Sequence, residues 1–108
     1  GTCSNSTRAI GGGGSIAYVN TNVIDLITIS TLGDAIDFGD LTTARGVLDA
    51  MSSQTRGVFG GGRIDSSSNS VNTLDHIEIQ TTGDAVDFGD LSVTRWVLSG
   101  CSNGHGGL

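Results

Sequence analysis

The chain has 108 residues, with eighteen glycines, no proline and a formal net charge of −6. All five basic residues are arginines, and ten of the eleven acidic residues are aspartates. This acidic balance argues against binding to nucleic acid or to an anionic membrane, because either partner needs a basic patch. No apolar run approaches the length of a transmembrane helix, so we expect no membrane insertion.

Two copies of one repeat of about 50 residues make up the sequence. Residues 31–51 align with residues 81–101 at an offset of 50, and residues 7–14 align with residues 55–62 at an offset of 48. We therefore expect a single repeat domain over 1–108: unit 1 covers about 1–50, unit 2 about 51–98, and an overlapping strand continues to 108. Because the pattern starts in mid-repeat at Gly1, we expect a processed or excised piece.

Each unit is predicted to form four short strands, because short apolar runs alternate with glycine-rich turns. In chain order, the expected strands are residues 8–10, 23–30, 35–38, 44–50, 56–59, 73–80, 85–88 and 94–100. Ile77 and Ile79 alternate with polar residues, as in a half-buried strand. The Ser- and Asn-rich stretches 15–25 and 63–75 are expected to be surface loops. No window favours a helix, so the prediction is an all-β fold.

The repeat resembles the kelch repeat of β-propellers. Arg45 and Arg95 match the arginine before the first kelch strand, and residues 58–62 match its apolar run ending in Gly-Gly. Phe38 and Phe88 stand near the place of the kelch tryptophan, and the usual preceding tyrosine is absent. The longer string, from Asp37-Phe38-Gly39-Asp40-Leu41 to Cys101-Ser102-Asn103, looks like repeats in virion structural proteins of marine phages, especially tail-associated proteins of phages that infect cyanobacteria.

This resemblance implies a kelch-like β-propeller in a virion or at another extracellular surface, with a role in tail-fibre structure or host attachment. It supplies no catalytic residues. Two four-stranded blades would leave sheet edges and apolar faces open, because a propeller removes its edges by closing a ring of four to eight blades. We therefore expect a homo-oligomeric ring of three or four chains, with a filament or a longer parent chain as alternatives. The predicted inter-subunit strand contains Val97, Leu98 and Cys101.

An acidic run occurs once in each unit, as Asp34, Asp37 and Asp40 and again as Asp84, Asp87 and Asp90. One interpretation is a calcium site, since Ca²⁺ prefers several carboxylate oxygens. The spacing does not match an EF-hand loop, however, and a strand would send neighbouring carboxylates to opposite faces. We favour turn-forming aspartates, with Asp40 and Asp90 paired to Arg45 and Arg95.

The remaining candidate residues carry no strong chemical signal. The triplets 12–14 and 60–62 lack the lysine and helix of a phosphate-binding loop, so we expect crowding near a propeller axis. His76 and His105 lack partners at zinc-ligand spacing. Cys3 and Cys101 either form a disulfide or are separate small apolar side chains, and we favour the latter. Trp96 either binds a sugar or packs as an ordinary aromatic residue.

The sequence therefore favours a non-enzymatic structural or receptor-binding module, with no cofactor, in which loop residues such as 66–72 contact a host receptor. The alternative is a carbohydrate-binding, lectin-like propeller for a host glycan, for which Trp96 is the candidate contact. An enzyme on the same scaffold is the least favoured reading, because no catalytic constellation is visible.

Overall fold

A computed structural model describes residues 1–67 and 69–102. This part of the chain contains eight β-strands and no helix, which confirms the all-β prediction. The strands are β1 (Thr2–Ser4), β2 (Arg8–Ile16), β3 (Val19–Thr28), β4 (Ile36–Asp40), β5 (Asp49–Ser52), β6 (Arg56–Gly60), β7 (Thr73–Glu78) and β8 (Val86–Asp90).

The strands form two four-stranded antiparallel sheets, one from each repeat unit. Strand order follows the sequence in both sheets, β1-β2-β3-β4 and β5-β6-β7-β8. Each register also shifts at the same point, after Ile24 in β3 and after Leu74 in β7. Equivalent residues occupy equivalent rows: Cys3, Ile10 and Leu26 in the first sheet, and Met51, Val58 and His76 in the second. The sequence repeat is therefore a structural repeat.

The predictions for residues 44–50 and 94–100 are wrong in part or in whole. In the first stretch the strand begins only at Asp49, and no strand lies in the second. The apolar pair Val47-Leu48 favoured a strand, but Val47 has φ of 54°, and Leu48 is buried beside Gly13. Val97 has the same φ of 54°. A left-handed residue ends strand pairing, so the apolar side chains here serve a packed loop.

The expected loop at residues 15–25 is also wrong. β2 continues to Ile16 and β3 begins at Val19, with Ala17 and Tyr18 as the two turn residues between them. Their φ values are 48° and 70°, as a tight type I′ hairpin turn requires. The corresponding second-unit residues between β6 and β7 form a longer connection, in agreement with the predicted surface loop there.

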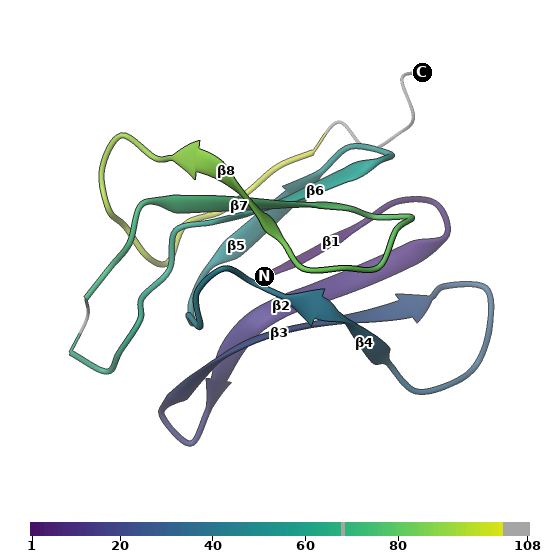
Figure 1. The fold of residues 1–108 in the computed structure, drawn as a ribbon, viewed down its shortest axis with the longest axis horizontal. Helices are drawn as coiled ribbons and strands as arrows, with labels where there is room; N and C mark the ends of the chain where they lie inside the picture. Colours follow the sequence, from purple (N-terminus) through teal and green to yellow (C-terminus); the bar gives the residue numbers. More distant parts are fainter. Residues whose placement is uncertain (68, 103–108) are drawn as a thin grey trace.

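The two sheets stack face to face, and the core lies between them (Figure 1). Phe59 is fully buried and lies over Gly12, where an added Cβ would come within 2.8 Å of its ring. Cys3 similarly lies over Gly57. The first sheet contributes Cys3, Ile10, Ile24, Leu26 and Phe38, and the second contributes Ala50, Phe59 and Ile77, with Ile79 directly after β7. Paired small and large residues thus allow close approach of the two sheets.

The second sheet also covers the free edge of the first. The backbone N–H groups of Gly83 and Ala85 donate to the carbonyls of Phe38 and Asp40, both at 2.8 Å. These bonds bring the loop before β8 beside β4 (Figure 1). At the opposite edge, β1 lies next to β5. Covering an edge strand in this way satisfies backbone groups that would otherwise attract another strand.

We predict that Gly12→Ala destabilises the fold by about 1–3 kcal/mol, because the new methyl group overlaps the Phe59 ring. Chemical denaturation followed by circular dichroism measures this difference. Gly11→Ala is the matched control in the same strand, since its Cβ would point to open space and meet only Thr2 at 3.8 Å. Equal destabilisation by both substitutions would contradict the proposed close packing.

Candidate functional site

Arg45 is the largest fully buried side chain in the described residues, and it lies between the two sheets. It belongs to the loop of residues 41–48 that follows β4. Two backbone bonds anchor this loop: the Gly14 N–H donates to the Arg45 carbonyl at 3.0 Å, and the Arg45 N–H donates to the Thr21 carbonyl at 3.3 Å. Gly13 must be glycine here, because its φ is +64° and a Cβ would lie 2.7 Å from the Arg45 carbonyl oxygen. The glycine triplet therefore makes room for the loop.

The guanidinium of Arg45 binds three oxygens of the second sheet. It donates to Asp75 Oδ2 at 3.0 Å, to the Phe59 carbonyl at 3.3 Å and to the Thr73 carbonyl at 3.2 Å. Asp75 is equally buried, and its Oδ1 accepts a 2.7 Å hydrogen bond from Thr42 Oγ1. Burial lowers the pKa of Arg45 from its ordinary value, and the charge of Asp75 opposes that shift.

This buried ion pair fixes how one repeat is placed on the next. A buried pair adds little net stability, because the desolvation of both charges offsets their attraction. A misplaced sheet would nevertheless leave a charge buried without its partner, which is costly. The predicted pairing of Arg45 with Asp40 is wrong, since the arginine reaches across to the other unit.

The repeat equivalents of this pair, Arg95 in unit 2 and Asp25 in unit 1, do not take part in such an interaction. Arg95, at the position of Arg45, is exposed, and so is Asp25, at the position of Asp75. Neither forms an ion pair within residues 1–67 and 69–102, so Arg95 is not paired with Asp90 as predicted. The chain thus contains a second copy of each partner, with Asp25 on the outer side of the first sheet and Arg95 in the segment after the second sheet.

The predicted inter-subunit residues lie in the segment that follows the second sheet. Val97 and Cys101 are exposed and Leu98 is half-buried. The Val97 N–H donates to the Val47 carbonyl at 3.2 Å, so this segment runs beside the loop of the first unit. Its pairing with another chain stays a prediction.

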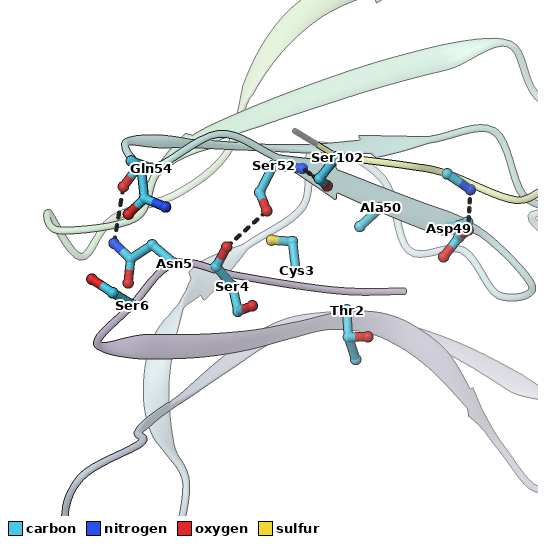
Figure 2. A pocket seen from close by; sticks show the side chains of 11 residues that line it. Thr2, Cys3, Ser4, Asn5, Ser6, Asp49, Ala50, Ser52, Gln54 and Ser102 are labelled. Carbon is cyan, nitrogen blue, oxygen red and sulfur yellow. Dashed lines mark hydrogen bonds between the residues drawn. The ribbon is translucent and has the colours of Figure 1, made fainter. Parts of the chain in front are cut away.

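A polar pocket of about 600 Å³ lies where β1, β5 and the C-terminal segment meet (Figure 2). Ser52 Oγ donates to the Ser4 carbonyl at 2.8 Å, and the Ser52 N–H donates to Ser102 Oγ at 2.7 Å. Ser4, Ser52 and Ser102 are equivalent positions of successive repeats. The pocket therefore lies between the first strands of the two units. Residue 102 lies on β5, where the first strand of a third unit would lie.

Two aspartates of the acidic runs accept backbone hydrogen bonds. Asp84 Oδ1 accepts the Asp40 N–H at 3.1 Å, and Asp87 Oδ1 accepts the Gly89 N–H at 3.2 Å. Among the described residues, no group of three or more His, Cys, Asp or Glu side chains is placed to hold a metal ion. A calcium site therefore has no geometric support in this part of the molecule.

A second groove, of about 480 Å³, opens at the end of the stack where the β2–β3 hairpin meets the β6–β7 connection. Its lining includes Tyr18, Asn20 and Arg63. The Asn20 side-chain amide donates to the Arg63 carbonyl at 2.8 Å and joins the two units here. Tyr18 is 90% exposed, although its backbone has the positive φ that a bulky residue rarely adopts. The turn thus presents an exposed aromatic ring from a strained backbone conformation.

Trp96 lies next to this groove and is 41% exposed. The guanidinium carbon of Arg63 is 5.2 Å from the centre of the indole ring, within the range of a cation–π interaction. Its counterpart Gly46 leaves no room for a side chain, because an added Cβ would lie 2.5 Å from Ser15 Oγ. Trp96 is thus a half-packed aromatic residue with one accessible side.

The histidine and cysteine candidates are dispersed. His76 contacts Phe88 edge to face, with ring centres 5.6 Å apart, on the outer face of the second sheet. His105 lies outside the described residues. Cys3 and Cys101 are free thiols. Burial raises the pKa of the Cys3 thiol to about 11, which makes it unreactive at neutral pH.

Sequence reasoning missed Asp75 and Tyr18. A signal for Asp75 existed, because this aspartate shares the apolar face of Ile77 and Ile79 in a strand of period two, where an acid must find a buried partner. The partner itself, 30 positions away, could not be read from the pattern. Tyr18 gave no signal, because the turn that presents it lacks the usual Asn-Gly residues.

A scan against protein-family models found no match to this chain, and a search of curated proteins found none either. Residues 1–67 and 69–102 contain no helix that is long and apolar enough to span a membrane.

We predict that Asp75→Asn destabilises the fold by about 3–5 kcal/mol, because Arg45 is left as a buried, uncompensated charge. Urea denaturation measures the loss. The control is Glu78→Gln, which removes the partner of Arg56 from an ion pair whose side chains are about half exposed, and costs at most about 1 kcal/mol. Similar losses in the two variants would contradict a special role for the buried pair.

Proposed function

We propose that this chain is a non-enzymatic structural or receptor-binding module of a virion or similar extracellular assembly, built from kelch-like propeller blades. One observation carries the proposal: two equivalent four-stranded sheets stack face to face in one direction. A directional contact can be repeated, whereas a two-fold contact ends with the pair. β1 lies against β5 at one side of the stack, which suits blades that converge at a central axis.

The kelch and phage-tail resemblance supports the virion assignment from the sequence side. The motif Asp-Phe-Gly-Asp-Leu makes up most of β4 and β8 and so occupies the same place in both units. A stacked array of such units would hold its end loops in a fixed arrangement on a rigid scaffold, as host attachment requires.

We expect small-angle X-ray scattering of the purified chain to show a disc-shaped particle with a radius of gyration well above the 13.3 Å of a single chain. A ring of three or four chains would form six or eight blades. Scattering that fits the isolated chain at all concentrations would contradict the propeller.

The alternative function is glycan binding at the end groove, favoured by the exposed rings of Tyr18 and Trp96 beside Arg63. Aromatic faces with polar neighbours suit sugars, which have one apolar face and a rim of hydroxyl groups. Glycan binding would also explain the backbone strain at Tyr18, because the turn places the aromatic ring where it can contact a sugar.

We predict that Tyr18→Gly stabilises the chain by about 1 kcal/mol, because glycine adopts positive φ without strain. The same variant should lose glycan-array binding, because the aromatic ring is removed. Higher stability with unchanged glycan binding would remove the groove from consideration. Trp96→Ala, tested in parallel, shows whether the neighbouring indole contributes.

A further inference from the structure

Each sheet has one face that the stack leaves uncovered. On the outer side of the second sheet, Phe88 is 51% exposed and Met51 is 38% exposed. On the outer side of the first sheet, Ile27 and Val23 are 44% and 41% exposed. We define the second-sheet face as Met51, Val58, Leu74, His76 and Phe88, and the first-sheet face as Ala9, Gly11, Val23, Asp25 and Ile27.

These two faces are the repeat equivalents of the two halves of the buried interface. The residues of the second-sheet face stand where Cys3, Ile10, Ile24, Leu26 and Phe38 stand in the first unit. Those of the first-sheet face stand where Gly57, Phe59, Thr73, Asp75 and Ile77 stand in the second. The molecule therefore carries both complementary halves of an interface whose geometry it already contains.

We propose that the second-sheet face docks onto the first-sheet face of a second copy of this chain, with Arg95 inserted between the sheets to bind Asp25 of that copy. The inference deepens the proposed function, on which it rests, because it names the partner and the contact. In such a junction Arg95 would also meet the equivalents of the other two acceptors, the carbonyls of Gly11 and Val23.

The loop that presents Arg95 already has the conformation of the loop that presents Arg45. The Gly62 N–H donates to the Arg95 carbonyl at 3.0 Å, as the Gly14 N–H donates to the Arg45 carbonyl at 3.0 Å. The Arg95 N–H donates to the Val71 carbonyl at 3.2 Å, matching the 3.3 Å bond from Arg45. A Cβ at Gly61 would lie 2.7 Å from the Arg95 carbonyl oxygen, the same separation as at Gly13. The loop is therefore already formed, but residues 100–102, which lie on β5 in the place that β1 of the docked copy would take, must move aside on docking.

The free edge of β8 also has the groups needed for such a junction. In the first unit, β4 accepts backbone bonds from Gly83 and Ala85 of the next unit. The equivalents of these donors are Gly33 and Ala35, which lie in the exposed turn before β4. A docked copy would bring them to the carbonyls of Phe88 and Asp90 and cover this second edge.

The substitutions between the two versions of the interface partly offset one another in volume. Phe59 is replaced by Gly11, which removes a large side chain, while Cys3 is replaced by Met51 and Gly57 by Ala9, which add volume. Met51 would face Ala9, as Cys3 faces Gly57, and its flexible side chain would have to turn aside to make room for the Ala9 methyl group. The junction is thus a variant of the internal interface and not a copy of it.

The test uses two single-charge variants of the full chain, Arg95→Glu and Asp25→Arg. Wild-type chain should form an oligomer by light scattering, and each variant alone should associate roughly thirtyfold or more weakly, because its junction places like charges together. An equimolar mixture should assemble again, since each chain then meets a partner of opposite charge at both ends. Because matched junctions must alternate, a ring of four chains would contain two of each variant, whereas a ring of three would keep one like-charged junction.

Both substituted positions are exposed in the single chain, so circular dichroism should show unchanged folds. A monomeric wild type, variants that associate as well as the wild type, or a mixture that stays dissociated would each overturn the proposal. If X-ray scattering shows a disc but the mixed variants do not assemble, the proposed Arg95–Asp25 junction is wrong and the proposed propeller is not contradicted.

A second measurement does not depend on charge. Ala9→Cys and Met51→Cys, with Cys101→Ser, place thiols on the two open faces at the equivalents of Gly57 and Cys3, where a Cβ at 57 would lie 2.6 Å from Cys3 Sγ. The two faces lie on opposite sides of the stack, so these thiols cannot meet within one chain. Oxidation should give a ladder of linked chains on a non-reducing gel, and monomer alone would contradict the docking.

Discussion

The guanidinium of Arg45 must be neutralised inside an apolar interface, and much of the structure follows from that requirement. Asp75 supplies the charge, and the carbonyls of Phe59 and Thr73 accept two further hydrogen bonds. The loop that carries Arg45 fits because Gly13 has no side chain and allows the Arg45 carbonyl to come close to it. Because a displaced sheet would leave a buried charge unpaired, the interaction selects one placement of one repeat on the next, and it gives that placement a direction.

Much of the fold could be predicted from the sequence, because its information is local. The two units, their hairpin signals and the alternation of Ile77 and Ile79 specified four strands in each sheet. Residues 44–50 were wrongly predicted to be a strand because Val47 and Leu48 form an apolar run. The structure shows that these residues belong to a packed loop, in which Leu48 is buried. The hairpin of β2 and β3 was misread as a loop because Ser15 and Asn20 suggested one, while the turn at Ala17 and Tyr18 lacks the residues that normally signal it.

The candidate sites were less predictable, because they depend on contacts between units. The glycine triplets were predicted to be crowded near a propeller axis; that axis stays a prediction, and the close neighbours of Gly13 and Gly61 are the carbonyls of Arg45 and Arg95. Pairing Arg45 with the nearby Asp40 followed sequence proximity, whereas the real partner comes from the next sheet. The end groove combines Tyr18 of one unit with Arg63 of the other. No pattern within one repeat contains such a site. An acid on a buried strand face, such as Asp75, does indicate that it has a buried partner.

A repeat that stacks in one direction buries its apolar face only against another repeat. This requirement links the interface to the proposed role in an extended surface assembly. The account is tested most directly by an experimental structure of the assembled particle. It predicts the Arg95 guanidinium within hydrogen-bonding distance of Asp25 of the neighbouring chain, beneath the second-sheet face. A particle in which Arg95 faces solvent, or in which two identical faces meet around a two-fold axis, would contradict it.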